Sequence, residues 1–301
     1  MWTDTEWLAQ AAFWAGQHAL PLSLVLLTLL LASTWVGWWL LRPGDRMSGP
    51  RAQKTLLTAP GITTLLLGAG VFTVLARALL MGPELGRVDQ LFTDALLAHV
   101  PPSALPVFAL LTHLADTAVL TGLGIGVAMA LVARRQPGLA LAWVAAVGGN
   151  SLLNHSLKQV FARTRPVDAD GLALAPGFSF PSGHSSGAVV AYGMLAYLAL
   201  KLLPPRWHLP ALLTAVTIAF MVCVSRLFLR VHFASDVLAG YMSGSVWLAL
   251  CILGVELLST VIQSRPSIVE ELVCSRTHCS SYTAFRYSEF HARKDDWGMG
   301  L

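Results

Sequence analysis

The sequence predicts an all-α membrane protein, a bundle of helices that crosses the lipid bilayer several times. Hydrophobic residues make up 55% of the 301 residues and charged residues only 12%, whereas soluble domains carry about 25% charged residues. The mean hydropathy is +0.63, and apolar runs of about 20 residues, the length that spans a bilayer, recur along the chain. We therefore do not interpret the net charge of +4 as a nucleic-acid signal, because the meaning of a charge in a membrane protein depends on its position.

Residues 1–58 are expected to form an N-terminal region. Residues 1–17 place three tryptophans among polar residues, a composition typical of a short helix at the lipid–water interface. Residues 19–41 form the first predicted span, and we expect it to be retained because no basic segment of a signal peptide precedes it. The loop 42–58 carries four basic residues against one acidic residue.

Residues 59–259 are expected to form the membrane core, which holds six further spans. Residues 83–115 are more polar and are interrupted by Pro101-Pro102, so we expect residues 90–114 to be short helices that lie on the membrane surface. The six predicted spans are residues 60–82, 116–133, 138–157, 185–203, 209–229 and 236–259.

Residues 260–301 are polar and are expected to form a cytoplasmic C-terminal tail. Cys274 and Cys279 flank His278 in this tail, which would allow a metal site, but one Cys-x4-Cys pair with one histidine is a weak signal for one. We therefore predict no metal ion and no cofactor.

Basic loops predict the orientation of the chain in the membrane. The loops 42–58, 134–137 and 201–208 are basic and fall at every second connection, so one topology places all three in the cytoplasm. The N-terminus then lies outside and the C-terminal tail inside. The segments that fall on the outer face are residues 83–115, 158–184 and 226–236.

Three polar clusters lie in these outer segments. The first begins at Lys158 and ends at Arg165, the second is Pro181-Ser182-Gly183-His184, and the third runs from Arg226 to Asp236. Interfaces tolerate basic residues at the ends of spans, but the outer face is normally depleted of Lys and Arg. Positive charge placed against this trend therefore favours a functional site.

The residue types in the clusters suit a phosphate dianion. Lys158, Arg165 and Arg226 supply three positive charges, and arginine binds phosphate oxygens with a planar fork of donors. Ser182 is a favoured N-cap residue, and a helix that begins at Gly183 would direct free backbone N–H groups toward an anion. The same donors would stabilise the charge of a phosphoryl-transfer transition state.

Two histidines complete the predicted site. His232 and Asp236 are four residues apart, so on a helix they share a face, and the carboxylate can fix the tautomer of the imidazole. The other ring nitrogen is then available as a nucleophile. His184 has no carboxylate in its own cluster, which suits an acid and base. The sequence contains no carboxylate cluster for a metal, so charge stabilisation falls to Lys and Arg.

The motifs Lys-x6-Arg-Pro, Pro-Ser-Gly-His and Ser-Arg-x5-His-x3-Asp occur in this order. In residue type and spacing they resemble the three signature motifs of the type 2 phosphatidic acid phosphatase superfamily, and the resemblance extends over residues 60–259. It implies that His232 forms a phosphohistidine, that Asp236 orients it, and that His184 protonates the leaving oxygen. The phosphate-binding residues that it implies are Lys158, Arg165, Arg226, Ser182 and Gly183.

Two positions depart from the family pattern. Family members often have Gly where Arg230 stands and Pro where Ala234 stands. We expect Arg230 to point to the membrane interface, although it could instead add positive charge for a diphosphate.

Asn154 and His155, one helical turn before the first cluster, are expected to have packing roles. Asp116 begins a span on the outer side and is a candidate partner for an active-site cation.

The predicted function is metal-independent hydrolysis of a lipid phosphate or diphosphate, at the outer face of a bacterial cytoplasmic membrane. The substrates considered are undecaprenyl diphosphate, phosphatidic acid, phosphatidylglycerol phosphate and lipid A phosphates. A phosphotransferase would use the same residues, and a phosphatase of soluble esters would share the motifs. A lipid-binding or transport protein without enzymatic activity is the alternative from a different class, and the His-Asp pair argues against it.

Overall fold

The computed structural model describes residues 4–41, 50–166 and 177–264, and side chains within 6–40, 60–166 and 177–259. All of the described elements are α- or 3₁₀ helices, so the predicted all-α class is confirmed. The loop residues 42–49 and the tail from residue 265, including Cys274, His278 and Cys279, lie outside the described residues.

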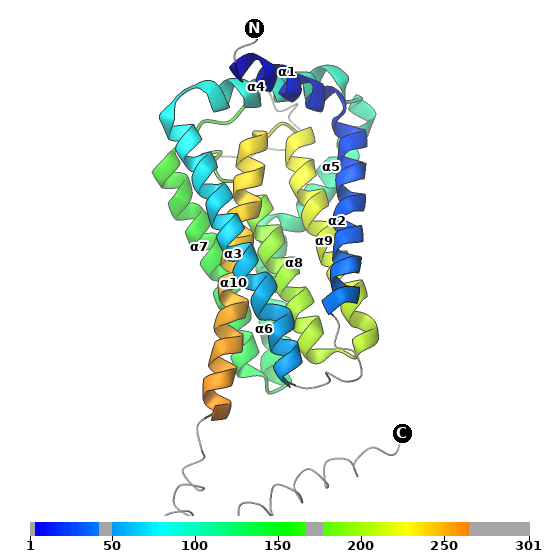
Figure 1. Ribbon diagram of the computed structural model, residues 1–301, viewed down its shortest axis with the longest axis vertical. Helices are drawn as coiled ribbons and strands as arrows, with labels where there is room; N and C mark the ends of the chain where they lie inside the picture. The colour runs from blue at the N-terminus through cyan, green and yellow to red at the C-terminus, as the bar shows by residue number, and fades with distance from the viewer. Residues whose placement is uncertain (1–3, 42–49, 167–176, 265–301) are drawn as a thin grey trace, which may run out of the picture. The chain divides into compact units, whose positions relative to one another are not determined.

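The N-terminal region consists of α1 (Asp4–Gln17), α2 (Ala19–Leu41) and the start of α3 (Pro50–Met81). In Figure 1, α1 lies across one end of the helices, and α2 and α3 run alongside the others. Helix α3 begins at Pro50, inside the segment predicted as the loop 42–58, because proline is well accommodated in the first turn of a helix. The apolar part of α3, Pro60–Met81, corresponds to the predicted span 60–82.

The predicted surface helices are α4 (Glu84–His99) and α5 (Leu105–Thr112), with 3₁₀ turns at Pro102–Ala104 and His113–Ala115. The chain bends by 97° between the segments Glu84–His99 and Pro102–Ala115, because the prolines at 101 and 102 interrupt the hydrogen-bond ladder of a helix. Helix α4 packs against α1 at the same end of the helices (Figure 1). This end therefore carries two helices that lie across the others.

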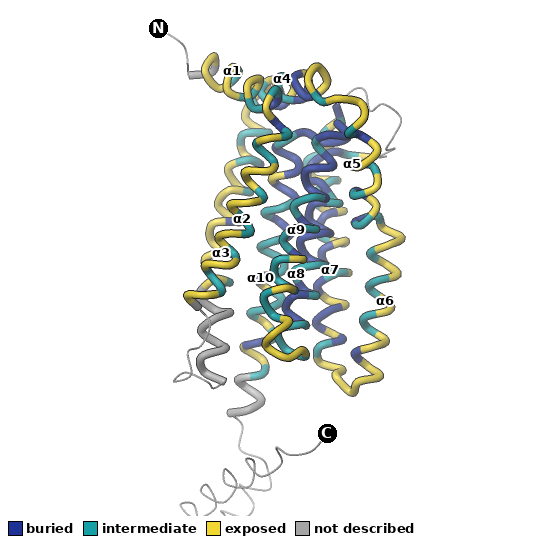
Figure 2. The backbone as a smooth tube through the Cα atoms, turned by 90° about the vertical axis from the view of Figure 1, so that its right-hand side faces the viewer, coloured by how far each residue is buried: buried dark blue, intermediate teal, exposed yellow. Residues whose placement is uncertain are grey.

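The remaining helices alternate in direction, and α6 lies at their edge (Figure 2). Helix α8 is central. Of its apolar 18-residue stretch, 61% is buried, compared with 6% for α2 and 11% for α3. Figure 2 shows the same contrast between buried and exposed backbone. These helices are α6 (Thr117–Ala133), α7 (Pro137–Phe161), α8 (Gly183–Leu202), α9 (His208–Phe228), preceded by a 3₁₀ turn at Pro205–Trp207, and α10 (Ala234–Ser264).

Fewer helices meet the requirements for a membrane span than the seven predicted. Five of the described helices are long and apolar enough, and a sixth is counted if the bent pair formed by α4 and α5 is one span. Helix α6 lies at its predicted position but has only 17 residues. Helix α7 has 25 residues, but it is not among the five, and its second half carries the polar residues Asn150, Asn154 and Lys158.

Close packing of α10 against the start of α8 depends on two glycines. A Cβ atom at Gly240 would lie 2.4 Å from the carbonyl oxygen of Ser182, and one at Gly244 would lie 2.8 Å from that of Ser186. Both distances are too short for any residue with a side chain, so glycine is required for this approach. The approach brings the turn before α8 against the first turns of α10.

The chain divides into two compact units, Met1–Val255 and Glu256–Leu301. The last turns of α10 therefore fall in the second unit. All of the predicted site residues lie in the first unit.

Candidate active site

The three polar clusters meet at one end of the first unit. They occupy the segment after α7, the turn before α8 and the connection from α9 to α10. The N–H of Ser182 donates to the carbonyl oxygen of Asp236 over 2.9 Å, which joins the second cluster to the third. Nη1 of Arg165 donates to the carbonyl oxygen of Val231 over 2.7 Å, which joins the first cluster to the third.

The turn before α8 is held rigidly by buried hydrogen bonds. Ser182 is fully buried and is the N-cap of α8, where its hydroxyl accepts from the N–H and the hydroxyl of Ser185, over 3.4 and 3.0 Å. The amide of Asn154 donates to the hydroxyl of Ser186 and the carbonyl of Pro181, over 3.3 and 3.5 Å. The packing role expected for Asn154 agrees with these contacts. His155 is exposed, so the packing role expected for it is wrong.

The His232 ring has different partners at its two nitrogens. Nη1 of Arg165 lies 3.0 Å from Nε2, and because arginine can only donate, Nε2 is the unprotonated nitrogen. Nδ1 lies 3.3 Å from the hydroxyl of Ser179 and 3.5 Å from Oδ2 of Asp236. The Ser179 hydroxyl itself donates to Oδ2 of Asp236. Ser179 therefore bridges the histidine and the aspartate, a position that the sequence motifs did not indicate.

His232 lies between the spans of α9 and α10 and is only 2% exposed. Burial lowers the pKa of His232 from 6.5 to about 3, although Asp236 acts to raise it. The positive charge of Arg165 lowers the pKa further. The ring is therefore neutral at pH 7, which is the protonation state that a nucleophile needs.

The three predicted phosphate-binding cations come from different segments. Lys158 and Arg165 both donate to the carbonyl oxygen of Phe178, which fixes them beside the second cluster. Arg226 is 2% exposed, and its Nη1 donates to the hydroxyl of Thr112 over 2.7 Å. Nε of Arg226 is buried and has no hydrogen-bond partner within the described residues. A buried donor without a partner is costly, and a bound anion would satisfy it.

A buried ion cluster supports Asp236 from its other side. Nη1 of Arg163 lies 2.7 Å from Oδ1 of Asp236, and Nη2 of Arg163 lies 2.8 Å from Oδ2 of Asp89 on α4. Asp89 also accepts from the N–H of Ser235 over 3.1 Å and from its hydroxyl. The sequence motifs did not indicate a role for Arg163 or for Asp89. The one local signal for Asp89 was an acidic residue on an otherwise buried face of α4.

His184 has a carboxylate partner that comes from outside its own cluster. Its Nε2 lies 2.9 Å from Oδ1 of Asp116, which is the N-cap residue of α6. Oδ2 of Asp116 lies 2.6 Å from Nδ1 of His113, whose side chain is 65% exposed. The expected pairing of Asp116 with an active-site group is therefore present in the structure, although the group is a histidine.

Arg230 is buried, so the expectation that it points to the membrane interface is wrong. The residue is 5% exposed and its backbone φ is 52°. This left-handed conformation favours glycine, which gives a physical reason for the glycine often found here in the family that the motifs resemble. Ala234, the second departure, is the first residue of α10.

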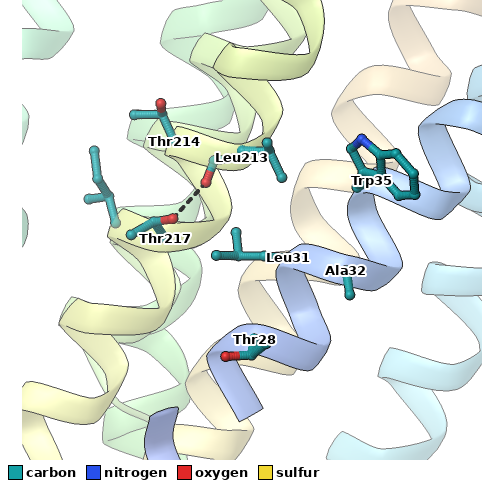
Figure 3. A pocket seen from close by; sticks show the side chains of 8 residues that line it. Thr28, Leu31, Ala32, Trp35, Leu213, Thr214 and Thr217 are labelled. Atoms are coloured by element: carbon teal, nitrogen blue, oxygen red, sulfur yellow. Dashed lines mark hydrogen bonds between the residues drawn. The ribbon is translucent and has the colours of Figure 1, made fainter. Parts of the chain in front are cut away.

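A separate cavity of about 570 Å³ lies between α2 and α9. Figure 3 shows Leu31 and Trp35 of α2 facing Leu213 and Thr217 of α9 across it. None of the predicted site residues lines this cavity, so it does not belong to the polar site.

Comparison with known proteins identifies relatives of the chain. Residues 137–258, which include all three clusters, match a family described as the PAP2 superfamily. The chain is 32% identical over 175 residues to phosphatidylglycerophosphatase B of Bacillus subtilis (strain 168), covering 58% of this chain and 85% of that protein. It also resembles the crystal structure of a transmembrane PAP2 type phosphatidylglycerolphosphate phosphatase from Bacillus subtilis. That match has a TM-score of 0.57 and 30% identity, over 64% of this chain and 94% of that chain.

Proposed function

This chain is an integral membrane phosphatase that belongs to the PAP2 superfamily, and we propose that it hydrolyses lipid phosphates through a phosphohistidine at His232. The observation that carries the proposal is the arrangement around the His232 ring. Arg165 faces the unprotonated Nε2, while Ser179 and Asp236 face Nδ1. A neutral imidazole whose free nitrogen is directed at an arginine suits attack on a phosphate held by that arginine.

In the first half-reaction, Nε2 of His232 attacks phosphorus, and the bond between phosphorus and the lipid oxygen breaks. Asp236 stabilises the positive charge that develops on the ring, as the aspartate does in Ser-His-Asp triads. His184 gives a proton to the leaving oxygen as general acid. In the second half-reaction, water attacks phosphorus, the bond between phosphorus and Nε2 of His232 breaks, and His184 takes one proton of that water.

The phosphate oxygens are bound by the cations and by the start of α8. Lys158, Arg165 and Arg226 supply positive charge, and the unpartnered Nε of Arg226 is a donor for one oxygen. Ser182 and Gly183 add donors at the helix N-terminus, where the helix dipole favours an anion. These groups supply the charge stabilisation that a metal ion supplies elsewhere, so we propose metal-independent catalysis.

The substrate we propose is a membrane lipid with a phosphate head group. The Bacillus subtilis relative is named for phosphatidylglycerol phosphate, so this lipid is the first candidate for the chain. Phosphatidic acid, undecaprenyl diphosphate and lipid A phosphates have the same reacting group. A site at the end of the spans would meet head groups without extracting the lipid from the bilayer.

We place the site at the outer face of the cytoplasmic membrane. The support is the distribution of positive charge along the chain. The connections α6–α7 and α8–α9 lie at the end of the helices opposite to α4 (Figure 1), and they carry Arg134, Arg135 and Arg206. Basic connections favour the cytoplasmic side, which leaves the three clusters at the exterior.

The test is phosphate release by the purified protein in detergent micelles. The four lipids, each labelled with ³²P in its phosphate, are compared with soluble phosphate esters, with and without a chelator. His232→Ala is the test variant, and His155→Ala, an exposed residue of α7, is the matched control. Rapid acid-free denaturation during turnover should trap label on the wild-type protein and none on His232→Ala.

We expect free phosphate from at least one lipid, chelator resistance, and no turnover by His232→Ala. Normal turnover by His232→Ala would overturn the proposed mechanism. Label that appears on an acceptor lipid would identify a phosphotransferase instead of a hydrolase. Release from soluble esters alone would exclude the proposed class of lipid substrate.

A further inference from the structure

A carboxylate from outside the three clusters contacts the proposed general acid. Asp116 is 68 residues away from His184 in sequence, yet Oδ1 lies 2.9 Å from Nε2 of the ring. Its second oxygen, Oδ2, lies 2.6 Å from Nδ1 of His113. The carboxylate is thus fixed on both sides, on one by the site histidine and on the other by a residue of the preceding 3₁₀ turn.

These contacts define which ring nitrogen of His184 carries a proton. Burial tends to raise the pKa of Asp116, but the hydrogen bonds from His113 and His184 lower the pKa below its usual value. Asp116 is therefore ionised at neutral pH and can only accept hydrogen bonds. Nε2 of His184 must be the donor. Nδ1 of His184 makes no hydrogen bond within the part of the chain that the structure describes and is left to act on a ligand.

We propose that Asp116 is a positioning residue for the reaction, which holds His184 with Nδ1 turned to the leaving oxygen and stabilises its imidazolium form. The inference rests on the proposed function, because it gives a role to a residue that acts through His184. It parallels the contact of Asp236 with His232, so each of the two histidines has its own carboxylate. Because the side chain of Asp116 is 38% exposed, its charge is partly screened, and we expect its effect at the lower end of the range for general acid catalysis.

The protons balance in both half-reactions. His184 begins as an imidazolium with Nε2–H bound to Asp116. When the bond between phosphorus and the lipid oxygen breaks, the proton on Nδ1 moves to that oxygen, and the neutral ring keeps Nε2–H. When water attacks phosphorus, the bond between phosphorus and Nε2 of His232 breaks, and Nδ1 of His184 takes one proton from the water, which restores the imidazolium. Asp116 remains a carboxylate throughout.

The test compares two leaving groups in the same lipid. One substrate is a lipid phosphate that the wild-type enzyme cleaves, and the other is the same lipid with sulfur in place of the bridging ester oxygen. A thiolate leaves without a proton, so its departure does not need the general acid. The variant is Asp116→Asn, which keeps the size of the side chain but cannot balance the imidazolium charge. Asp94→Asn, an exposed residue of α4, is the matched control.

We expect Asp116→Asn to lower kcat for the oxygen ester by about 100-fold, the lower end of the usual contribution of general acid catalysis, and to change the sulfur ester by less than about threefold. His184→Ala should give the same pattern, and adding Asp116→Asn to His184→Ala should cause no further loss, since the two residues act as one unit.

An equal loss for both esters, or an additive loss in the double variant, would overturn the inference. Equal loss would mean that Asp116 supports the structure of the site without serving proton transfer. These outcomes are distinct from a failure of the proposed function, in which the wild-type enzyme would release phosphate from none of the four lipids or His232→Ala would retain turnover. Because the comparison of the oxygen and sulfur esters is a ratio measured within one variant, it also holds if Asp116→Asn lowers the yield of folded protein.

Discussion

Nη1 of Arg163 lies 2.7 Å from Oδ1 of Asp236, and this contact joins the segment after α7 to the first turn of α10. The same guanidinium reaches Asp89 of α4 through its other nitrogen, at 2.8 Å. The side chains are 9% exposed or less. A single arginine thus balances two buried carboxylates, one of which faces the proposed nucleophile.

Removal of the Arg163 charge should destabilise the protein. Arg163→Gln leaves Asp89 and Asp236 without their counter-ion, and breaking a buried ion pair in this way costs about 3–5 kcal/mol. We expect a lower midpoint of thermal unfolding in detergent and loss of phosphate release. Adding Asp89→Asn should restore part of the stability, because one uncompensated charge is removed. The control is Arg87→Gln, which changes an exposed residue of α4. An Arg163→Gln protein as stable as wild type would contradict the prediction.

Arg226→Lys should weaken phosphate binding. Lysine keeps the positive charge but lacks the planar fork of donors, so it cannot replace both the bond from Nη1 to Thr112 and the unpartnered Nε. Loss of one hydrogen bond to a charged group costs about 1.5–3 kcal/mol, which corresponds to about 10–100-fold in affinity. Inhibition by vanadate measures this affinity. Arg206→Lys, which changes a residue at the opposite end of the helices, should be inhibited by vanadate as strongly as wild type. An unchanged vanadate affinity of Arg226→Lys would show that Arg226 does not bind the phosphate.

The low pKa of His232 should make the folded protein less stable in acid. Burial lowers the pKa from 6.5 to about 3, so below pH 6.5 the unfolded chain binds a proton here that the folded protein does not bind. Stability from this residue is therefore fully present above 6.5 and falls as the pH decreases toward 3. The unfolding midpoint of His232→Gln should depend less steeply on pH across this window than that of wild type. Equal slopes for His232→Gln and wild type would contradict the burial argument.

Gly240→Ala should disrupt the site although it replaces none of the polar residues of the site. The new Cβ would lie 2.4 Å from the carbonyl oxygen of Ser182, so either α10 or the turn before α8 must move. Overpacking of this kind costs about 1–3 kcal/mol, and the displaced backbone should also lower kcat for phosphate release. Gly254→Ala is the matched control in the same helix, because nothing lies within 4 Å of its Cβ position. Equal activity of the two variants would show that the contact with Ser182 does not position the turn.

Much of the fold could be predicted from the sequence, because the length of an apolar run is a local property. The helices α8, α9 and α10 lie within a few residues of the predicted spans. The count of seven spans was less successful, since α7 combines a helix of sufficient length with polar residues that face the site. Composition alone cannot separate a polar span that is shielded by its neighbours from a helix that does not cross the membrane.

By itself the sequence determined which chemical groups the three clusters contain and how they are spaced. Lysine, arginine and histidine at this spacing predict a phosphate site: Lys158, Arg165, His184, Arg226 and His232. Only the tertiary structure decided which carboxylate or hydroxyl serves each of these groups. Asp116 meets His184 across 68 residues, Asp89 meets Arg163 across 74, and Ser179 meets Asp236 across 57. Contacts over such separations depend on how the helices pack, and packing leaves no periodic signal along the chain.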